Sequence, residues 1–284
     1  MGYIERKVIK KELKGKVAVI CGGSKGIGKE TAKLFAKLGA DILIIARDLE
    51  ALEQTKKECI QQADSSNQEI DIQSCDCTDY DKLKPILENY ILKKGIPDFL
   101  INLVGYAISQ YVEKITLLEF KNNFETNYYG QLIPTLILLP HMMNKKNGQI
   151  VFVSSALGYM GFMGFASYSP SKFALVGLAE SLRNELSPYN IKISVLYPSD
   201  TDTPGLEMEN RTKPQECKSI SGKAKLFQPD TVAKFFVKGV LKKKFTIMKG
   251  DVKLYWWIKR FAPRLVFSFI DGDLAKARKK MGKD

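Results

Sequence analysis

The chain of 284 residues is poor in the residues that build metal centres and disulfide frameworks. It has one histidine, His141, and its five cysteines include no Cys-x-x-Cys pair. Zinc sites and disulfide scaffolds need such clusters, so neither is predicted and no metal ligand is expected. We expect reduced, mostly buried thiols, which fit a cytosolic compartment.

The chain also lacks a long hydrophobic run. A membrane-spanning helix needs about 20 apolar residues, and the nearest approach, Leu132–Pro140, contains Thr135 and two prolines. The first residues, Met-Gly-Tyr-Ile-Glu-Arg-Lys, have no apolar core of a secretory signal, and Arg6 stands where a myristoylation signal has Ser or Thr. We therefore expect no spanning helix, no signal peptide and no lipid anchor.

Positive charge, by contrast, is in excess. Lys+Arg number 44 against 31 Asp+Glu, a net charge of +13, which suggests nucleic acid, a phospholipid surface or a phosphorylated cofactor as partner. Residues 234–284 hold 15 Lys/Arg and 4 Asp/Glu, or +11, which leaves +2 for residues 1–233. A body that binds nucleic acid would carry the basic stripe itself, and no nucleic-acid motif is evident. The excess is therefore assigned to a C-terminal appendage.

Short apolar runs alternate with helical patterns from Lys16 to Tyr197. This alternation is typical of β-α-β units and predicts an α/β fold with a single Rossmann-type doubly wound parallel sheet. We expect six strands, at 16–21, 41–46, 71–75, 99–104, 149–154 and 191–197, with helices that include 31–38, 49–62 and 83–93. The alternation stops at Pro198. We expect a main domain at 1–233, with a substrate loop at 198–225, and a basic amphipathic appendage at 234–284.

A glycine-rich turn follows the first expected strand and directly precedes a helix. It reads Gly22-Gly23-Ser24-Lys25-Gly26-Ile27-Gly28. Glycines let the backbone approach a pyrophosphate closely, and the N-terminus of a helix favours its negative charge. The turn therefore predicts dinucleotide binding. The alternative is that it is only a tight connection between the strand and the helix.

The residue after the second expected strand indicates which dinucleotide is bound. An acidic residue there would hold the ribose 2′-hydroxyl of NAD, whereas a cation can pair with the 2′-phosphate of NADP. The chain has Arg47 at this place and Lys25 in the glycine-rich turn as a second cation. NADP(H) is therefore predicted. The alternative is that Arg47 is a solvated surface residue and Asp48 binds the ribose.

A third motif reads Tyr168-Ser169-Pro170-Ser171-Lys172, with Ser154 and Ser155 upstream at the end of a strand. A tyrosine and a lysine four apart share one face of a helix, where the ammonium can lower the pKa of the phenol for proton transfer. Pro170 is tolerated in the first turn of a helix. The alternative is a surface pair that shares a face by chance.

Together these motifs resemble those of the short-chain dehydrogenase/reductase family, over roughly residues 14–203. The resemblance implies a Rossmann-fold oxidoreductase in which Tyr168 exchanges a proton with the substrate oxygen and Lys172 contacts the nicotinamide ribose. Ser155, with Ser154 as the fallback, would hydrogen-bond the substrate carbonyl, and Asn127 would hold a water in the proton relay. The expected cofactor contacts are Gly22, Ser24, Lys25, Gly26, Ile27, Gly28, Arg47, Asp76, Asn102, Tyr168, Lys172, Thr201 and Thr203.

A narrower resemblance lies beyond the sixth expected strand, at 198–205 and 209–214. The second stretch, Glu-Asn-Arg-Thr-Lys-Pro, resembles that of the 3-ketodihydrosphingosine reductases. This resemblance implies NADPH-dependent reduction of 3-ketosphinganine to sphinganine and a substrate lid at 204–225. The alternatives are a reductase of another lipid or steroid ketone and a non-catalytic Rossmann protein that binds anions or membranes. The chain departs from the family pattern at Cys21, Leu103, Val104 and Ser199, none of which is a proton-transfer group.

The appendage combines aromatic and basic residues. In Val252–Ile270, Lys253, Arg260, Arg264 and Ser268 would form one stripe on a helix, and a basic run follows at 276–280. This pattern resembles a helix that lies in the headgroup layer of an anionic membrane. We expect peripheral attachment to the cytosolic side of a membrane, the endoplasmic reticulum in a eukaryote. Because of Pro263, a pair of helices is as well supported as one rod. Packing onto the body, as a subunit interface of a homo-oligomer or a wall of the substrate cleft, is the alternative to membrane binding.

Overall fold

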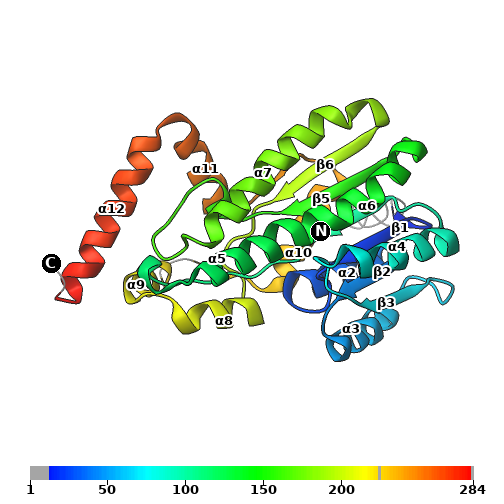
Figure 1. Ribbon diagram of the computed structural model, residues 1–284, viewed down its shortest axis with the longest axis horizontal. Coiled ribbons are helices and arrows are strands. Elements are labelled where there is room, and N and C mark those ends of the chain that lie inside the picture. Colours follow the sequence, from blue (N-terminus) through cyan, green and yellow to red (C-terminus); the bar gives the residue numbers. More distant parts are fainter. Residues whose placement is uncertain (1–12, 223–224, 283–284) are drawn as a thin grey trace.

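A seven-stranded parallel sheet forms the centre of the molecule (Figure 1). The computed structural model describes residues 13–222 and 225–282. The N-terminal residues on which the expectation of no signal peptide and no lipid anchor rests lie outside this range. The strand order is β3-β2-β1-β4-β5-β6-β7. The strands are β1 (Val17–Cys21), β2 (Asp41–Ala46), β3 (Ile70–Ser74), β4 (Phe99–Asn102), β5 (Gly148–Val153), β6 (Ile191–Leu196) and β7 (Thr246–Ile247).

Helices cover both faces of this sheet. Those of the sheet domain are α2 (Gly26–Lys37), α3 (Leu49–Gln62), α4 (Tyr80–Lys94), α5 (Leu117–Phe124), α6 (Gly130–Lys145), α7 (Tyr168–Glu185) and α10 (Pro229–Leu241). Between α5 and α6 lies the π-helical turn η2 (Glu125–Tyr129), and short 3-10 turns lie at η1 (Val112–Lys114), η3 (Ala156–Gly158) and η4 (Ser187–Tyr189). Beyond the sheet lie α8 (Pro204–Thr212), α9 (Gln215–Ser221), α11 (Asp251–Phe261) and α12 (Pro263–Lys280).

The two faces of the sheet build two separate parts of the core. Because side chains alternate between faces along a strand, Val19 of β1 packs with the helices α4, α6 and α7, whereas Ile20 packs with α2, α3 and α10. Nearly all the central strand residues are apolar and buried, as in parallel sheets covered on both sides. The predicted doubly wound parallel sheet is confirmed.

The prediction of six strands is wrong by one, because β7 pairs in parallel with the outer edge of β6. This strand has two residues, Thr246 and Ile247, and is separated from a run of three lysines only by Phe245. A run this short shows no period-2 pattern. Its burial comes from pairing with β6 and from contact with Gly239 of α10, where an added Cβ would lie 2.7 Å from Ile247 Cγ2.

The expected boundary between residues 233 and 234 falls inside α10. This helix packs against α2, and its Phe236 and Val240 are fully buried in the core. Because α10 and β7 complete the sheet layer, we propose that the sheet domain continues through Ile247 and that the appendage begins near Asp251.

The appendage consists of two helices that form a hairpin. α11 ends at Phe261 and α12 begins at Pro263, where proline is tolerated because the first helical N–H has no partner. The stripe expected along one rod is therefore divided between two helices, which is the helix-pair alternative. α12 contacts α9 and extends away from the sheet (Figure 1). No helix in the described ranges is both long and apolar enough to span a bilayer.

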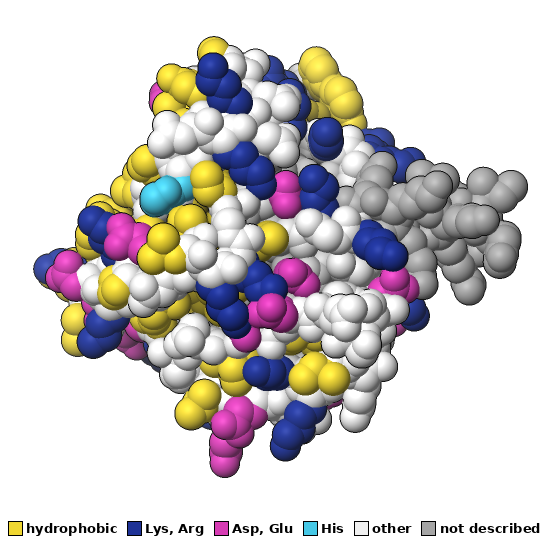
Figure 2. Space-filling model, turned by 90° about the vertical axis from the view of Figure 1, so that its right-hand side faces the viewer, with side chains coloured by type: hydrophobic (Ala, Val, Ile, Leu, Met, Phe, Trp, Pro, Cys, Tyr) yellow, Lys and Arg dark blue, Asp and Glu magenta, His cyan; other side chains and the backbone are white. Residues whose placement is uncertain are grey.

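The hairpin differs from the opposite end of the molecule in what it exposes. Its exposed apolar side chains include Phe261 (74% exposed) and Phe269 (62% exposed), with Leu254, Tyr255, Trp257, Leu265 and Phe267. On the end turned away from α12, hydrophobic, basic and acidic side chains are intermixed (Figure 2). The concentration of exposed aromatic residues is thus a feature of the hairpin.

Candidate active site

The loops at the carboxyl ends of the strands carry the predicted site residues. β1 and β4 are neighbours at the centre of the sheet, and the chain turns outward in opposite directions from them. Ligands of doubly wound sheets bind in the crevice at such a switch point. Gly22 follows β1, Arg47 follows β2, Asp76 follows β3, Ser155 follows β5 and Thr201 follows β6.

The glycine-rich turn passes close to two other segments of the site. Gly22 and Gly26 have φ angles of +80° and +54°, which side chains with a Cβ rarely adopt. A Cβ on Gly22 would lie 2.8 Å from the backbone of Leu103 and Val104, and one on Gly26 would lie 2.8 Å from Thr203 Cγ2. No side chain caps the N-terminus of α2 and its first turn has no acidic residue. The cradle and the helix end thus fit a pyrophosphate.

The remaining residues of the turn anchor it to the body. Thr55 Oγ1 donates a hydrogen bond to the Ser24 carbonyl at 3.0 Å, and Ile27 packs against the core. Gly28 leaves no room for a side chain beside Gly22. These residues are predicted cofactor contacts, and the structure places all of them in the turn or at the start of α2.

Two exposed cations lie at the end of β2 and in the turn, each next to a carboxylate. Lys25 Nζ lies 2.7 Å from Asp48 Oδ2, and Arg47 Nη1 lies 3.7 Å from Asp76 Oδ2, with 72% of the Arg47 side chain exposed. Asp48 also caps α3 by accepting a hydrogen bond from the Ala51 N–H. Its pKa is lowered by the hydrogen bond from Lys25 and then by that backbone bond.

Tyr168 and Lys172 lie on one face of the first turn of α7, as predicted. Lys172 Nζ is 5.6 Å from the centroid of the Tyr168 ring and donates a hydrogen bond to the Val153 carbonyl at 3.0 Å. Lys172 is only 3% exposed, and burial lowers its pKa to about 7.

The expected lowering of the Tyr168 pKa is wrong for this arrangement. Burial raises the pKa of the phenol above its ordinary value, a hydrogen bond with Ser155 lowers it in part, and the charges of Glu209 and Asp200 raise it again. Desolvation outweighs the other effects because neutral forms are favoured in the interior. A phenol with a raised pKa carries its proton at neutral pH, which suits a proton donor.

The two serines at the end of β5 have different roles. Ser154 is buried and its hydroxyl donates to the Lys172 carbonyl at 2.9 Å, which ties β5 to α7. The Ser155 Oγ accepts a hydrogen bond from the Leu157 N–H and interacts with Tyr168. The Ser155 hydroxyl therefore lies next to the Tyr168 phenol, whereas the hydroxyl of Ser154 is engaged with the backbone.

Asn127 lies in the π-helical turn between α5 and α6, fully buried. Its side chain accepts from the Tyr106 N–H at 2.9 Å and donates to the Tyr106 carbonyl and to Asn123 Oδ1. A Cβ added at Gly105 would lie 2.6 Å from Asn127 Oδ1 and 3.0 Å from Lys172 Nζ. Asn127 and Lys172 thus face the same small space. Single π turns are frequent at functional sites because they redirect one side chain.

Three further predicted residues are engaged within the protein. Asn102 is buried and its Nδ2 donates to Thr135 Oγ1 at 3.1 Å. Thr201 Oγ1 donates to the Ser199 carbonyl, and Thr203 caps α8 by accepting from the Leu206 N–H. The Asn102 Oδ1 atom, by contrast, is buried without a hydrogen-bond partner among the described residues.

Gln131 is a buried residue of the site that the motifs did not indicate. Its Nε2 donates to the carbonyls of Val104 and Val153, and its Oε1 accepts from the Val153 N–H. It thus joins the loop after β4 to the end of β5, next to the carbonyl that Lys172 contacts. A polar residue directly before the apolar run Leu132–Pro140 was the available signal.

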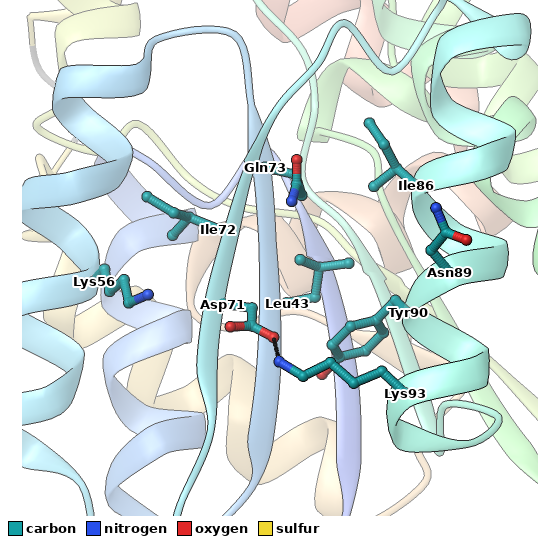
Figure 3. A pocket seen from close by; sticks show the side chains of 9 residues that line it. All are labelled: Leu43, Lys56, Asp71, Ile72, Gln73, Ile86, Asn89, Tyr90 and Lys93. Carbon is teal, nitrogen blue, oxygen red and sulfur yellow. Dashed lines mark hydrogen bonds and ion pairs between the residues drawn. The ribbon is translucent and has the colours of Figure 1, made fainter.

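A hollow in the surface lies elsewhere. It has a volume of about 390 Å³ and is lined by β2, β3, α3 and α4, with Asp71 and Lys93 paired at 2.9 Å and Tyr90 beside them (Figure 3). None of the predicted site residues lines it. The candidate site is therefore defined by the motif residues and their contacts.

Comparison with known proteins gives the chain clear relatives. The family model of the short chain dehydrogenases matches residues 16–214. The chain is 42% identical to a 3-dehydrosphinganine reductase of Danio rerio, over 84% of this chain and 72% of the relative. It is also 42% identical to a 3-ketodihydrosphingosine reductase of Dictyostelium discoideum, over 81% and 73%. A metagenomic short-chain oxidoreductase solved in complex with NADP superimposes with a TM-score of 0.66 at 24% identity, over 81% of this chain and 91% of that one.

Proposed function

This chain belongs to the short-chain dehydrogenase/reductase family, and we propose that it reduces the ketone of 3-ketosphinganine to the alcohol of sphinganine with NADPH as hydride donor. The enzyme is an oxidoreductase of sphingolipid synthesis that binds a nicotinamide cofactor and acts on a long-chain lipid ketone. The observation that carries the proposal is the grouping of Ser155, Tyr168 and Lys172 beside the glycine-rich turn in a chain 42% identical to such reductases.

The chain's own residues supply the proton. NADPH, when bound, supplies the hydride that adds to the carbonyl carbon. We propose that the Tyr168 hydroxyl donates its proton to the carbonyl oxygen, which Ser155 orients by a hydrogen bond. The phenolate left behind is stabilised by the Lys172 ammonium and is reprotonated from solvent through Lys172 and a water held by Asn127. The shared space at Gly105 supports this route.

A preference for NADPH is supported by Lys25 and Arg47, the exposed cations of the turn and of the end of β2. Replacing both by alanine should raise KM for NADPH by roughly 10- to 100-fold and leave KM for NADH nearly unchanged, because the 2′-phosphate loses charge-assisted hydrogen bonds. Steady-state kinetics with both cofactors measures this. Lys37→Ala, at the exposed far end of α2, is the matched control. If the wild type instead uses NADH better than NADPH, and Asp48→Ala abolishes this use of NADH, the assignment to NADP is wrong.

The hairpin of α11 and α12 supports peripheral attachment to an anionic membrane, the endoplasmic reticulum in a eukaryotic cell. Exposed Trp257, Phe261 and Phe269 lie among Lys259, Arg260 and Arg264. Trp257 and Phe261 stack in parallel at 5.5 Å, and Lys259 Nζ lies 3.6 Å from the Phe267 ring centroid. Aromatic and basic side chains together suit the interface of a bilayer with anionic headgroups. The substrate, a long-chain lipid, would be found there.

Charge reversal in the hairpin tests this attachment. Replacement of Lys259, Arg260 and Arg264 by Glu should move the protein from the floating to the soluble fraction with vesicles that contain phosphatidylserine. Each basic residue near an anionic membrane surface contributes about 1 kcal/mol to binding. The matched control replaces the exposed Lys57, Lys84 and Lys121 of α3, α4 and α5 in the same way. Deletion of 251–284 should have the same effect. Unchanged flotation of both hairpin variants would exclude the membrane role.

The substrate assignment is tested by NADPH consumption with three ketones. We expect turnover of 3-ketosphinganine to exceed that of a steroid ketone and of a short 3-oxoacyl thioester. A preference for either of the other two ketones would overturn the proposed substrate but not the assignment to the short-chain dehydrogenase/reductase family.

A further inference from the structure

Glu209 is an acidic residue of α8 whose charge acts on the catalytic tyrosine. α8 begins at Pro204, after the carboxyl end of β6, and its capping residue Thr203 lies against Gly26 of the glycine-rich turn. The negative charge of Glu209 acts on the Tyr168 phenol, and that of Asp200 acts on both. A charged group on the substrate would therefore meet a negative potential next to Tyr168.

A buried lysine holds Glu209 in place. Lys213 Nζ lies 2.7 Å from Glu209 Oε1, and only 3% of the lysine side chain and 16% of the glutamate side chain are exposed. The same ammonium lies 5.9 Å from the centroid of the Phe165 ring, and that ring lies 6.1 Å from the Tyr168 ring. The glutamate is therefore connected to Tyr168 by one ion pair and one aromatic side chain.

The segment that precedes Tyr168 is packed against the same part of the lid. A Cβ on Gly164 would lie 3.0 Å from Cys217 Sγ and 3.3 Å from Pro214 Cδ. Cys217 Sγ donates a hydrogen bond to the Met163 carbonyl. This packing fixes the position of Glu209 relative to the catalytic residues.

The charges in this region do not balance. Lys213 pairs with Glu209, and among the described residues no further cation lies within ion-pair distance of Glu209 and none within that distance of Asp200. A carboxylate has two oxygens that can each accept hydrogen bonds, and Lys213 contacts only Oε1. The remaining acceptor capacity of Glu209 is thus available to a cationic ligand.

We infer that the Glu209 carboxylate binds the ammonium group of the substrate and so determines specificity for 2-amino ketones. This inference rests on the proposed function. In 3-ketosphinganine the amino group is on the carbon next to the ketone, so a ketone held by Tyr168 places the ammonium within a few ångströms of it. Steroid ketones and 3-oxoacyl thioesters have no cation at this place. Glu209 is therefore a specificity residue, whereas Tyr168 performs the proton transfer.

The test compares two substrates that differ only in the amino group: 3-ketosphinganine and the same hydroxy ketone without the amine. Glu209→Gln should raise KM for the amino ketone by roughly 10- to 100-fold, the loss expected for a charge-assisted hydrogen bond. KM for the deaminated ketone and kcat for both should change less than about threefold. The wild type should prefer the amino ketone by a similar factor.

Two further variants separate recognition from structural damage. Glu209→Gln together with Lys213→Met removes both charges, so no buried ammonium is left unpaired, and it should lose the same preference for the amine. Glu207→Gln, on the exposed side of α8, should keep the wild-type ratio. An equal loss for both ketones, or an unchanged ratio, overturns the inference. If the wild type fails to reduce 3-ketosphinganine at all, it is the proposed function that fails.

Discussion

Replacing Tyr168 by phenylalanine should lower kcat for 3-ketosphinganine by roughly 10²- to 10⁴-fold, the range that general acid catalysis contributes. The hydroxyl of a tyrosine carries its proton at neutral pH, and burial raises the pKa of Tyr168 further above that range. Phenylalanine keeps the ring that packs at 6.1 Å from Phe165 and removes only the donor. Turnover is measured as NADPH consumption, and cofactor binding as quenching of protein fluorescence.

The binding measurement distinguishes loss of the proton donor from loss of the site. Kd for NADPH should change less than about threefold, since the glycine-rich turn is independent of the phenol. Tyr80→Phe, an exposed tyrosine at the start of α4, is the matched control and should be fully active. Retained turnover of the Tyr168 variant would refute the assigned proton donor.

The parts of the fold that the sequence predicted well are those with local signals. The central strands are apolar runs because both faces of the parallel sheet are buried, and β2 and α3 have the predicted bounds. The glycine-rich turn and the Tyr168–Lys172 pair are likewise defined by short spacing. Since the carboxyl ends of parallel strands share one edge, residues that follow strands gather there whatever lies between them.

Features that depend on distant contacts could not be predicted in the same way. The π turn at Asn127 results from one irregular step in the helical hydrogen-bond ladder, and no residue type marks such a step. The direction of the Tyr168 pKa shift is set mainly by burial, which the lysine four residues away in the sequence does not reveal. Whether Pro263 bends or divides the appendage is likewise decided by packing, here through Val252 and Val266.

Lys172→Met should abolish activity and, at the same time, make the protein without cofactor more stable. Burial lowers the pKa of Lys172 to about 7, against 10.5 for the ordinary side chain. Each unit of difference corresponds to about 1.4 kcal/mol, so the buried ammonium costs several kcal/mol at neutral pH, partly offset by its hydrogen bond to Val153. Methionine is of similar length and carries no charge to desolvate.

The pH dependence of this effect has a definite sign. Between about pH 7 and 10.5 the unfolded chain keeps the proton on Lys172 while the folded protein releases it, so stability of the wild type rises with pH through this window. The gain in Tm of Lys172→Met should therefore be largest at pH 6 to 7 and shrink towards pH 10. Calorimetry of the protein without cofactor at pH 6.5 and 9.5 measures this. If the gain in Tm is equal at both pH values, or if Tm falls at pH 6.5, the buried ammonium of Lys172 does not destabilise the folded protein and this prediction is wrong.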